Sequence, residues 1–248
     1  MSAPLLQARD LRIAFHAVQA ADGVNLEIRE GEFLAIIGPN GSGKTTFLNL
    51  CTGYLRPSSG EIYLDGKPIT ALAPRVIARR GIARAFQIPQ VFLDLSVIEN
   101  MMIAVAARSG IFSALQGLGA RGRRQEAMDL LALVKLDGEA AKSARTLPEG
   151  RRKLLDIALA LALKPRLLLL DEPTSGVSTI ERFDLMETLM TALRGAGLTA
   201  LFVEHDMDVV RRYADRVLVW DSGSVLAEGP PEVIFSNRDV LRKVVGGV

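Results

Sequence analysis

A glycine-rich segment constrains the fold of this chain more than any other feature of its sequence. Residues 38–45 read GPNGSGKT and match the phosphate-binding pattern G-x-x-x-x-G-K-[ST]. The apolar run at residues 33–37 is typical of a buried parallel strand, and residues 46–50 can continue as a helix. A strand, a glycine-rich loop and a helix in this order predict an α/β protein with a nucleoside triphosphate site.

The residue types in this loop suit the chemistry of phosphate binding. Glycines let successive backbone N–H groups point at phosphate oxygens, Lys44 supplies a positive charge, and Thr45 supplies a hydroxyl group for magnesium. The alternative is a glycine-rich turn without a ligand, which the flanking strand and helix disfavour. We therefore expect the nucleotide to be bound by Gly38, Pro39, Asn40, Gly41, Ser42, Gly43, Lys44, Thr45 and Thr46.

Two acidic residues follow a second apolar run. Residues 167–170 are all leucine, and Asp171 and Glu172 come directly after them. A buried strand of a parallel sheet delivers such carboxylates to its carboxyl edge, where ligands bind. We expect Asp171 to hold Mg²⁺, directly or through water, and Glu172 to orient or deprotonate the attacking water. The alternative is that the two acids only open a turn before Pro173.

The composition is that of an ordinary globular protein. Of the 248 residues, 49% are hydrophobic and 23% are charged, which predicts one compact domain. The net charge of +2 is too small to indicate a nucleic acid or a membrane surface as a partner. Two groups of arginines, at residues 75–84 and 121–124, are interpreted as solvated helix faces.

Three rarer features bear on compartment and environment. The single cysteine, Cys51, excludes an internal disulfide and is expected to be a small buried hydrophobe, whereas His16 is expected in a surface turn. The sequence starts without a basic-then-apolar signal segment, and no apolar run approaches the roughly 18 residues that cross a bilayer. We expect a cytoplasmic protein unless a partner holds it at a membrane.

Turn residues divide the rest of the chain into short elements. Strands at residues 5–15 and 18–28 suggest a small antiparallel layer before the phosphate loop. A strand at residues 61–64 ends in an Asp65-Gly66 turn, and a helix at residues 74–80 follows. Residues 97–144 have a helical pattern and are interpreted as an inserted subdomain. Further strands are expected at residues 166–170, 199–203, 216–220 and 224–228.

These elements predict an α/β fold, with a P-loop NTPase core built on a mainly parallel sheet, an N-terminal antiparallel β layer and an inserted α-helical subdomain. The order of the motifs resembles the ATP-binding subunits of ABC transporters. The phosphate loop, residues 167–172 and Val203-Glu204-His205-Asp206 occur in that family's order and approximate spacing, and the resemblance covers nearly the whole chain.

The resemblance implies one ABC ATPase domain spanning residues 1–248. Within it we expect the helical subdomain near residues 97–144 and a C-terminal helical tail near residues 231–248. The implied ligands are ATP and Mg²⁺, and the implied reaction is an ATPase reaction coupled to transmembrane transport.

The resemblance also assigns side chains to the site. Gln87 resembles the glutamine that joins the ATPase core to the helical subdomain and senses magnesium and the γ-phosphate, although taken alone it would be interpreted as a surface amide. His205 resembles the switch histidine that contacts the γ-phosphate and helps to position water. With Lys44 and Glu172, these two complete the expected catalytic set. Phe15 resembles the aromatic residue that stacks on adenine, with core packing as the alternative.

The family pattern is broken at two places. Its signature, usually Leu-Ser-Gly-Gly-Gln, reads LPEGR at residues 147–151, so that Pro148 replaces a serine hydroxyl and Glu149 adds a negative charge near an anion. The helix N-terminus at Gly150 can still meet a phosphate, and our hypothesis is that Arg151 compensates the charge of Glu149. Ser178 stands where the family commonly has an aspartate, which we interpret as a subfamily feature.

Residues 81–87, 97–100 and 231–241 resemble subunits of importers for branched-chain amino acids, amides and urea. This resemblance implies a homodimer or a heterodimer with a second ATPase subunit, transmembrane permease subunits, an extracytoplasmic solute-binding protein reached indirectly, and no nucleic acid. The chain is then expected at the cytoplasmic face of the inner (plasma) membrane, as a peripheral subunit.

The apolar stretch at residues 88–92 is the expected docking groove for a permease helix, with packing on the chain's own helical subdomain as the alternative. Two other functions remain open. One is a nucleotide-dependent scaffold with weak hydrolysis, which the altered signature favours. The other is a non-transport ABC ATPase that acts on DNA or the ribosome, which the single domain and modest basic clustering disfavour.

Overall fold

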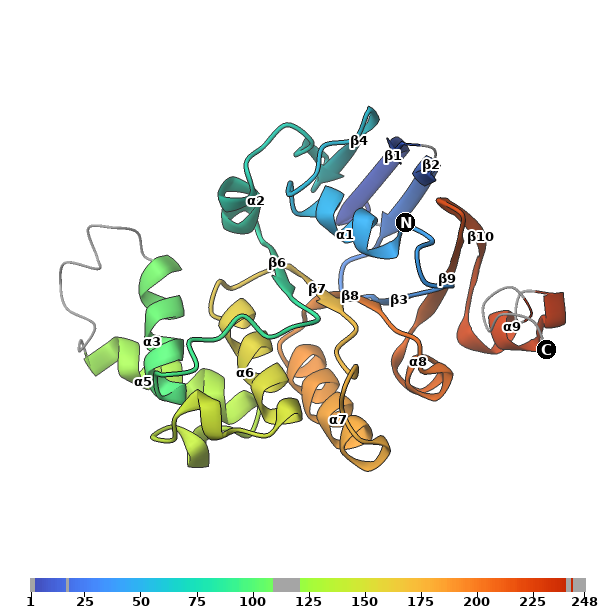
Figure 1. Cartoon of the computed structure of the whole chain (residues 1–248). Coiled ribbons are helices and arrows are strands. Elements are labelled where there is room, and N and C mark those ends of the chain that lie inside the picture. Colours follow the sequence, from blue (N-terminus) through green and yellow to red (C-terminus); the bar gives the residue numbers. More distant parts are fainter. Residues whose placement is uncertain (1–2, 17, 109–120, 240–241, 243–248) are drawn as a thin grey trace.

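Two β-sheets and a group of helices make up the fold (Figure 1). The computed structural model describes residues 3–16, 18–108, 121–239 and 242. A six-stranded sheet has the order β10-β9-β3-β8-β7-β6, in which β10 is antiparallel to β9 and the other five strands are parallel. Its strands are β3 (Phe33–Ile37), β6 (Ile82–Ala85), β7 (Leu167–Asp171), β8 (Thr199–Val203), β9 (Arg216–Asp221) and β10 (Ser224–Gly229).

A second, four-stranded sheet is antiparallel throughout and has the order β2-β1-β4-β5. It contains β1 (Leu6–Phe15), β2 (Val18–Ile28), β4 (Ser59–Leu64) and β5 (Lys67–Pro68). The helix α1 (Lys44–Cys51) lies between this sheet and the six-stranded sheet, and its apolar side chains join the core that the two sheets share (Figure 1). The predicted antiparallel layer is therefore confirmed.

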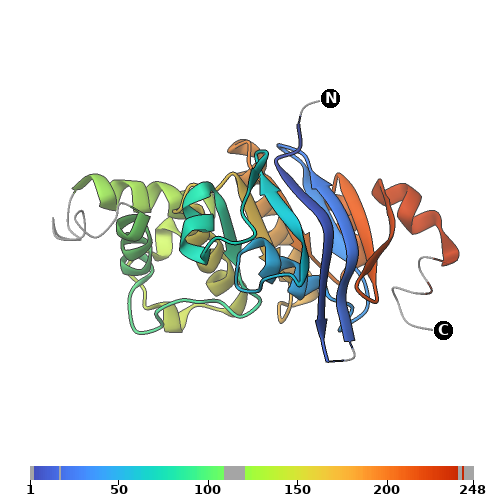
Figure 2. The same cartoon turned by 90° about the horizontal axis from the view of Figure 1, so that it is seen from above.

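The other helices lie on the opposite face of the six-stranded sheet or beyond its edges. They are α2 (Pro74–Arg80), α3 (Val97–Arg108), α5 (Arg121–Leu133), α6 (Glu149–Leu161), α7 (Thr179–Gly195), α8 (Met207–Tyr213) and α9 (Pro231–Ser236), with short 3-10 turns at Asp137–Glu139 and Ala144–Thr146. Seen from above, α3 and α5 project at one end of the molecule and α9 lies at the other (Figure 2). Among the described residues, no helix is long and apolar enough to cross a bilayer.

The central strands lie between two hydrophobic cores, because successive side chains of a strand point to opposite faces of the sheet. In β3, Phe33, Ala35 and Ile37 join the core on the helical face, whereas Leu34 and Ile36 join the core that contains α1. Strands that are buried on both faces read as continuous apolar runs, which is why β3, β7 and β8 could be located from the sequence.

The sequence missed β6, and one interpretation made there is wrong. Arg84 was grouped with solvated arginines, but its side chain is 5% exposed and lies within β6. A charged residue in a four-residue strand masks the apolar pattern, and the strand is recognisable only through its pairing with β7. The two-residue β5, which follows the predicted Asp65-Gly66 turn, was also missed.

Two predicted segments extend beyond what the structure describes. Within the expected helical region near residues 97–144, α3 and α5 are present, and residues 109–120 lie outside the described residues. Of the helical tail expected at residues 231–248, the structure contains α9, and residues 240–241 and 243–248 lie outside the described residues.

Candidate functional site

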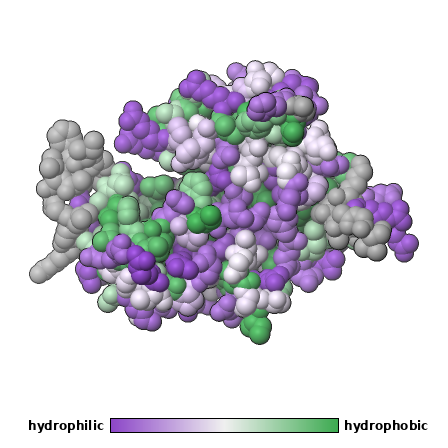
Figure 3. Space-filling model, viewed as in Figure 1, coloured by the Kyte–Doolittle hydropathy of each residue, from purple (hydrophilic) through white to green (hydrophobic). Residues whose placement is uncertain are grey.

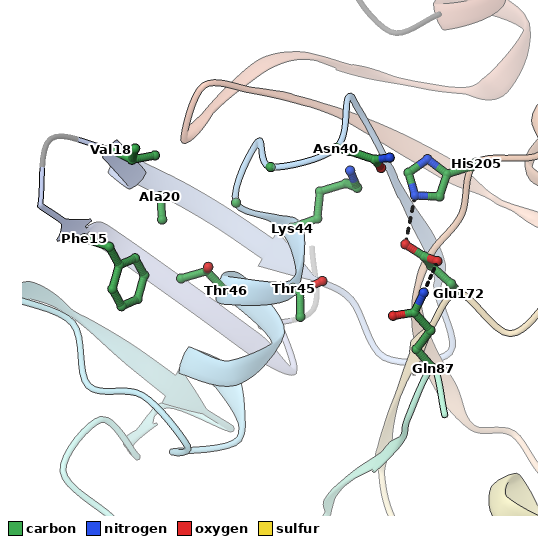
Figure 4. A pocket seen from close by; sticks show the side chains of 12 residues that line it. Phe15, Val18, Ala20, Asn40, Lys44, Thr45, Thr46, Gln87, Glu172 and His205 are labelled. Carbon is green, nitrogen blue, oxygen red and sulfur yellow. Dashed lines mark hydrogen bonds and ion pairs between the residues drawn. The ribbon is translucent and has the colours of Figure 1, made fainter. Parts of the chain in front are cut away.

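A cavity of about 520 Å³ lies at the carboxyl edge of the six-stranded sheet, where the segments after four of its strands meet (Figure 4). The phosphate loop follows β3, Gln87 follows β6, Glu172 follows β7 and His205 follows β8. The cavity is lined by Phe15, Val18, Ala20, Asn40, Gly41, Gly43, Lys44, Thr45, Thr46, Gln87, Glu172 and His205. The topology thus brings together residues that lie far apart in the sequence.

The phosphate loop has a backbone that only glycine can adopt at its tightest point. Gly43 has φ +112°, and a Cβ atom there would lie 2.0 Å from the carbonyl oxygen of Ala20. Gly43 is also the N-cap of α1 and has no side chain to bond the first N–H groups of the helix. The N-terminus of α1 therefore presents backbone donors to the cavity, as an anion site requires.

Lys44 is nearly buried, and its ammonium group is held by the loop itself. Its Nζ donates to the carbonyl oxygens of Gly38 and Pro39, each at 2.8 Å. Burial lowers the pKa of Lys44, and the nearby carboxylates of Glu172 and Asp171 oppose this shift. Gly38 and Pro39 are not among the lining residues of this cavity, and their carbonyl oxygens position the lysine.

Ser42 also lies outside the lining of the cavity. Its hydroxyl group is buried and has no hydrogen-bond partner among the residues that the structure describes.

Glu172 is held between two side chains from neighbouring strand ends (Figure 4). Gln87 Nε2 donates to one carboxylate oxygen at 2.7 Å, and His205 Nε2 lies 2.9 Å from the other. Because a carboxylate only accepts hydrogen bonds, both neighbours act as donors. Glu172 has φ +49°, a left-handed conformation that costs about 1–3 kcal/mol in a non-glycine residue. Such strain is typical of a functional position.

A buried acid fixes the segment that carries His205. Glu204 is 2% exposed, and its carboxylate accepts hydrogen bonds from Thr174 N and Oγ1 at 3.0 and 2.8 Å and from His205 N at 3.1 Å. Burial raises the pKa of Glu204, and these hydrogen bonds oppose the shift. The strand ends at β7 and β8 are thereby tied together next to the cavity.

Asp171 does not line the cavity, contrary to the simplest expectation for a metal ligand. Its side chain is 4% exposed and forms an ion pair with Arg84 at 2.5 Å, and Arg84 also donates to Asn49 Oδ1 at 2.6 Å. In the described part of the chain no group of three or more His, Cys, Asp or Glu residues could hold a metal ion. The protein alone therefore supplies few charged ligands here.

The residues nonetheless fit a magnesium ion that is bound together with phosphates. Mg²⁺ in such sites takes one or two carboxylates, with phosphate oxygens and waters as its other ligands. Thr45 and Gln87 carry side-chain oxygens and line the cavity. Asp171 immediately precedes Glu172 in the sequence. An arrangement in which Asp171 acts through water agrees with its position better than direct coordination does.

Gly150 lies away from this cavity. It is in the first turn of α6 and lines a separate cavity of about 410 Å³ between α6 and α7, together with Lys135, Pro148 and Arg151. The structure therefore does not bring Gly150 to the phosphate loop of its own chain. Pro39 and Ser42 also line a different cavity, but theirs adjoins the phosphate loop itself.

Glu149 forms its ion pair with Arg152, not with Arg151, the residue that our hypothesis favoured. Arg152 Nη2 lies 2.7 Å from Glu149 Oε2, an i to i+3 pair on α6. Arg151 instead donates to the carbonyl oxygen of Lys135 at 2.8 Å and lies 3.7 Å from Glu139. Residues three positions apart lie on the same side of a helix, so Arg152 faces Glu149. Arg151, two positions after Glu149, lies on a different side of the helix.

Other expectations can be compared directly with the geometry. Phe15 is 44% exposed and lines the cavity, so core packing does not account for it. His16 lies in an exposed turn, and Cys51 is fully buried, as the sequence predicts. Ser178 is the N-cap of α7, where its Oγ accepts from Glu181 N at 3.4 Å. The serine therefore has a structural role at the position where the family commonly has an aspartate.

Sequence reasoning missed four residues near the site. Val18 and Ala20 of β2 line the cavity, and Lys153 and Asp156 of α6 lie behind it. The two charged residues left a signal: they lie three positions apart on a helix whose other buried residues are apolar. No comparable signal marked Val18 or Ala20.

Comparison with known proteins agrees with this geometry. The family described as ABC transporter matches residues 21–175. The high-affinity branched-chain amino acid transport ATP-binding protein BraF of Pseudomonas aeruginosa is 38% identical over 255 residues, covering 99% of each chain. A probable branched-chain amino acid transport ATP-binding protein, LivG of Archaeoglobus fulgidus, is 36% identical over 246 residues, covering 98% of this chain and 95% of that protein.

Two solved structures extend the comparison to three dimensions. An ATP-binding cassette of an ABC transporter in its ADP conformation has a TM-score of 0.87 and 30% identity, covering 99% of this chain and 100% of that one. A dimeric cassette in a post-hydrolysis state, bound to ADP and Pi, has a TM-score of 0.77 and 28% identity, covering 91% of this chain and 98% of that one. The similarity thus includes the whole two-sheet architecture.

Proposed function

This chain belongs to the ABC transporter family, as an ATPase cassette that couples ATP hydrolysis to transport, and we propose that it energises the import of branched-chain amino acids or of a similar small polar solute such as an amide or urea. The branched-chain amino acid solute is supported by the names of the full-length relatives, and the direction of transport rests on the sequence resemblance to importers.

One observation carries the catalytic part of the proposal. Glu172 is fixed by Gln87 and His205 at the end of the cavity toward which the Lys44 side chain points (Figure 4). Phosphates bound to the loop and to Lys44 would place the γ-phosphate toward Glu172, which then orients and deprotonates the attacking water. Phe15 offers an aromatic face to the base at the other end of the cavity.

Magnesium would be held by Thr45, by Gln87 and through water by Asp171, in addition to the phosphates. When bound, it supplies positive charge that stabilises the charge developing on the phosphate oxygens. Lys44 and the loop N–H groups supply the rest of that stabilisation. His205 Nε2 lies 2.9 Å from Glu172 Oε1 and, as a donor, would hold the carboxylate facing the bound phosphates.

We propose that a second ATPase subunit completes the site. Gly150 and the N-terminus of α6 line a different cavity from Lys44, so they can act only on nucleotide bound by another subunit. The dimeric cassette with ADP and Pi supports this arrangement. The second subunit is either a copy of this chain or a distinct ATPase.

A permease partner is proposed at the loop between β6 and α3. Ile88 is 74% exposed and Phe92 is 57% exposed, whereas Val91 packs against the core of the chain. Hydrophobic residues gather on the part of the surface that carries α3 and α5 (Figure 3). Docking there would hold the subunit at the cytoplasmic face of the inner membrane, with an extracytoplasmic solute-binding protein on the other side.

The ATPase proposal is tested by phosphate release with and without Mg²⁺. Wild type should hydrolyse ATP only with the metal, and Lys44→Met should lose ATP binding and hydrolysis because the buried ammonium group at the loop is removed. Lys164→Met, which changes an exposed lysine far from the cavity, is the matched control and should behave as wild type. ATP binding by wild type without turnover would instead indicate a nucleotide-dependent scaffold.

The docking proposal is tested by charge placed in the exposed patch. Phe92→Asp should release the subunit from membranes that contain its permease and leave ATP hydrolysis by the isolated subunit unchanged. Leu226→Asp is the control, since Leu226 is 40% exposed on β10, outside the proposed patch. Retained membrane association of Phe92→Asp would count against this surface.

A further inference from the structure

The helix α6 carries two charged side chains on its buried face. Lys153 is 3% exposed and Asp156 is 5% exposed, and the other buried residues of the helix are apolar. Removing a charge from water costs free energy unless the group is paired or hydrogen-bonded. The partners of these two side chains are therefore informative.

Lys153 reaches the backbone of two residues whose side chains line the nucleotide cavity. Its Nζ donates to the carbonyl oxygen of Glu172 at 3.0 Å and to that of Gln87 at 3.2 Å. One ammonium group thus joins the segment after β7 to the segment after β6, on the side away from the cavity. The Gln87–Glu172 hydrogen bond joins the same two residues on the cavity side.

Asp156 holds the same segment one helical turn further along. Its two carboxylate oxygens accept from Phe86 N at 3.0 Å and from Gln90 N at 2.9 Å. The backbone on both sides of Gln87 is therefore anchored to α6. Together with Lys153, the helix fixes this loop at three points.

The contact with Glu172 matters because that residue has an unfavourable backbone conformation. Its φ of +49° is left-handed, and residues persist in that region only when their surroundings determine it. Its N–H donates to the carbonyl oxygen of Val203 at 3.0 Å, and its own carbonyl oxygen accepts from Lys153. Those two bonds hold the peptide groups on either side of the left-handed Cα atom.

Burial of Lys153 and the carboxylates around it act on its charge in opposite directions. Burial lowers the pKa of Lys153, and nearby carboxylates oppose this shift, those of Glu149, Glu204, Glu172 and Asp156. An ammonium group donates more strongly to carbonyl oxygens than a neutral amine does. The acids around it therefore support the two contacts described above.

We propose that Lys153 is a positioning residue, which acts through the backbone of Glu172 and Gln87 to hold the Glu172 carboxylate in the geometry needed for hydrolysis, and that Asp156 supports it by fixing the loop around Gln87. The proposal rests on the role proposed above for Glu172. Lys153 does not itself line the cavity and reaches Gln87 and Glu172 only through their backbone carbonyl oxygens, so its replacement should leave nucleotide affinity nearly unchanged.

The test compares Lys153→Met with wild type in Mg²⁺-dependent ATP hydrolysis and in ATP binding. Methionine fills a similar volume but cannot donate. Because a displacement of about 1 Å can cost about 10²-fold in rate, kcat should fall about 10- to 100-fold, while KM and the Kd for ATP stay within about two-fold. Lys153→Arg retains donors and should restore part of kcat. Lys142→Met is the control, since Lys142 is exposed.

A double-mutant cycle shows whether Lys153 acts through Glu172. In single-turnover experiments, adding Lys153→Met to Glu172→Gln should cause little further loss, because the residue that it positions is already inactive. Asp156→Asn is the second variant, since its amide keeps only one acceptor oxygen for two N–H groups, and a smaller loss of kcat with unchanged ATP affinity is expected.

Wild-type kcat in Lys153→Met would overturn the inference. So would a parallel loss of kcat, ATP affinity and melting temperature with no rescue by arginine, because that pattern indicates a general structural role. If Glu172→Gln hydrolyses ATP at the wild-type rate, both the role of Glu172 and this inference fail. If Glu172→Gln is inactive and Lys153→Met is normal, only this inference fails.

Discussion

Two buried charged side chains near the cavity, Lys44 and Arg84, have defined hydrogen-bond partners. Lys44 is held by carbonyl oxygens of its own loop, whereas Arg84 of β6 reaches Asn49 of α1 and Asp171 of β7. Removing one partner of a buried pair leaves an uncompensated charge, which costs more than the pair contributes. Substitutions that remove one partner of a buried pair should therefore have the largest effects on stability.

Arg84→Met should destabilise the protein by about 3–5 kcal/mol, because Asp171 would remain buried without its partner. The double variant Arg84→Met with Asp171→Asn should recover much of that loss, since no unpaired charge remains. Urea unfolding without nucleotide and metal measures both. Equal stability of Arg84→Met and wild type would show that water already screens this pair.

Cys51 should be unreactive in the folded protein. It is fully buried, burial raises the pKa of its thiol, and Arg84 opposes that shift only in part. The thiolate is the reactive form, so a thiol reagent at pH 8 should label the native protein slowly and should label one thiol per chain after unfolding in urea. Rapid labelling of native protein would mean that α1 opens away from the core between the sheets.

At the scale of elements, the sheet determines which residues can meet. Parallel strands end at one edge, so residues after β3, β6, β7 and β8 converge although they are separated in sequence. Apolar runs predicted β3, β7 and β8, and the glycine pattern predicted the loop, because both signals are local. The Arg84–Asp171 pair joins residues 87 positions apart and could not be read from any local pattern.

The helix α6, which begins at the altered signature, and the start of α7 show which features the sequence could not predict. The sequence predicts α6, yet only the structure shows that Arg152 rather than Arg151 pairs with Glu149 and that Lys153 points inward. Ser178 marks a departure from the family pattern, and the structure shows that it caps α7. Side-chain direction on a helix depends on how the helix packs, which the sequence leaves open.

Ser178→Ala should destabilise α7 by about 0.5–2 kcal/mol, because the N-cap oxygen that accepts from Glu181 N is lost. Ser178→Asp should retain most of the stability, since aspartate is an equally good N-cap. Chemical denaturation measures both variants. If alanine is tolerated and aspartate destabilises, capping is not the reason for serine at this position.

At the scale of the whole molecule, the two main cavities discussed above lie at different positions in the fold. The cavity with Lys44 and Glu172 lies where the segments after the parallel strands meet α1, and the cavity with Gly150 lies between α6 and α7. The helix α6 contributes to both regions, because its N-terminus lines one cavity and Lys153 supports the residues of the other. The separation of the two cavities is the basis of the second ATPase subunit proposed above.

The measurement that tests the central claim most directly is single-turnover hydrolysis of Mg-ATP by wild type and Glu172→Gln, with ATP affinity measured on the same samples. The account predicts a rate at least about 10²-fold lower in Glu172→Gln with unchanged affinity, since a general base contributes about 10²- to 10⁴-fold. Glu232→Gln, an exposed acid on α9, should match wild type. Hydrolysis by Glu172→Gln at the wild-type rate would contradict the account.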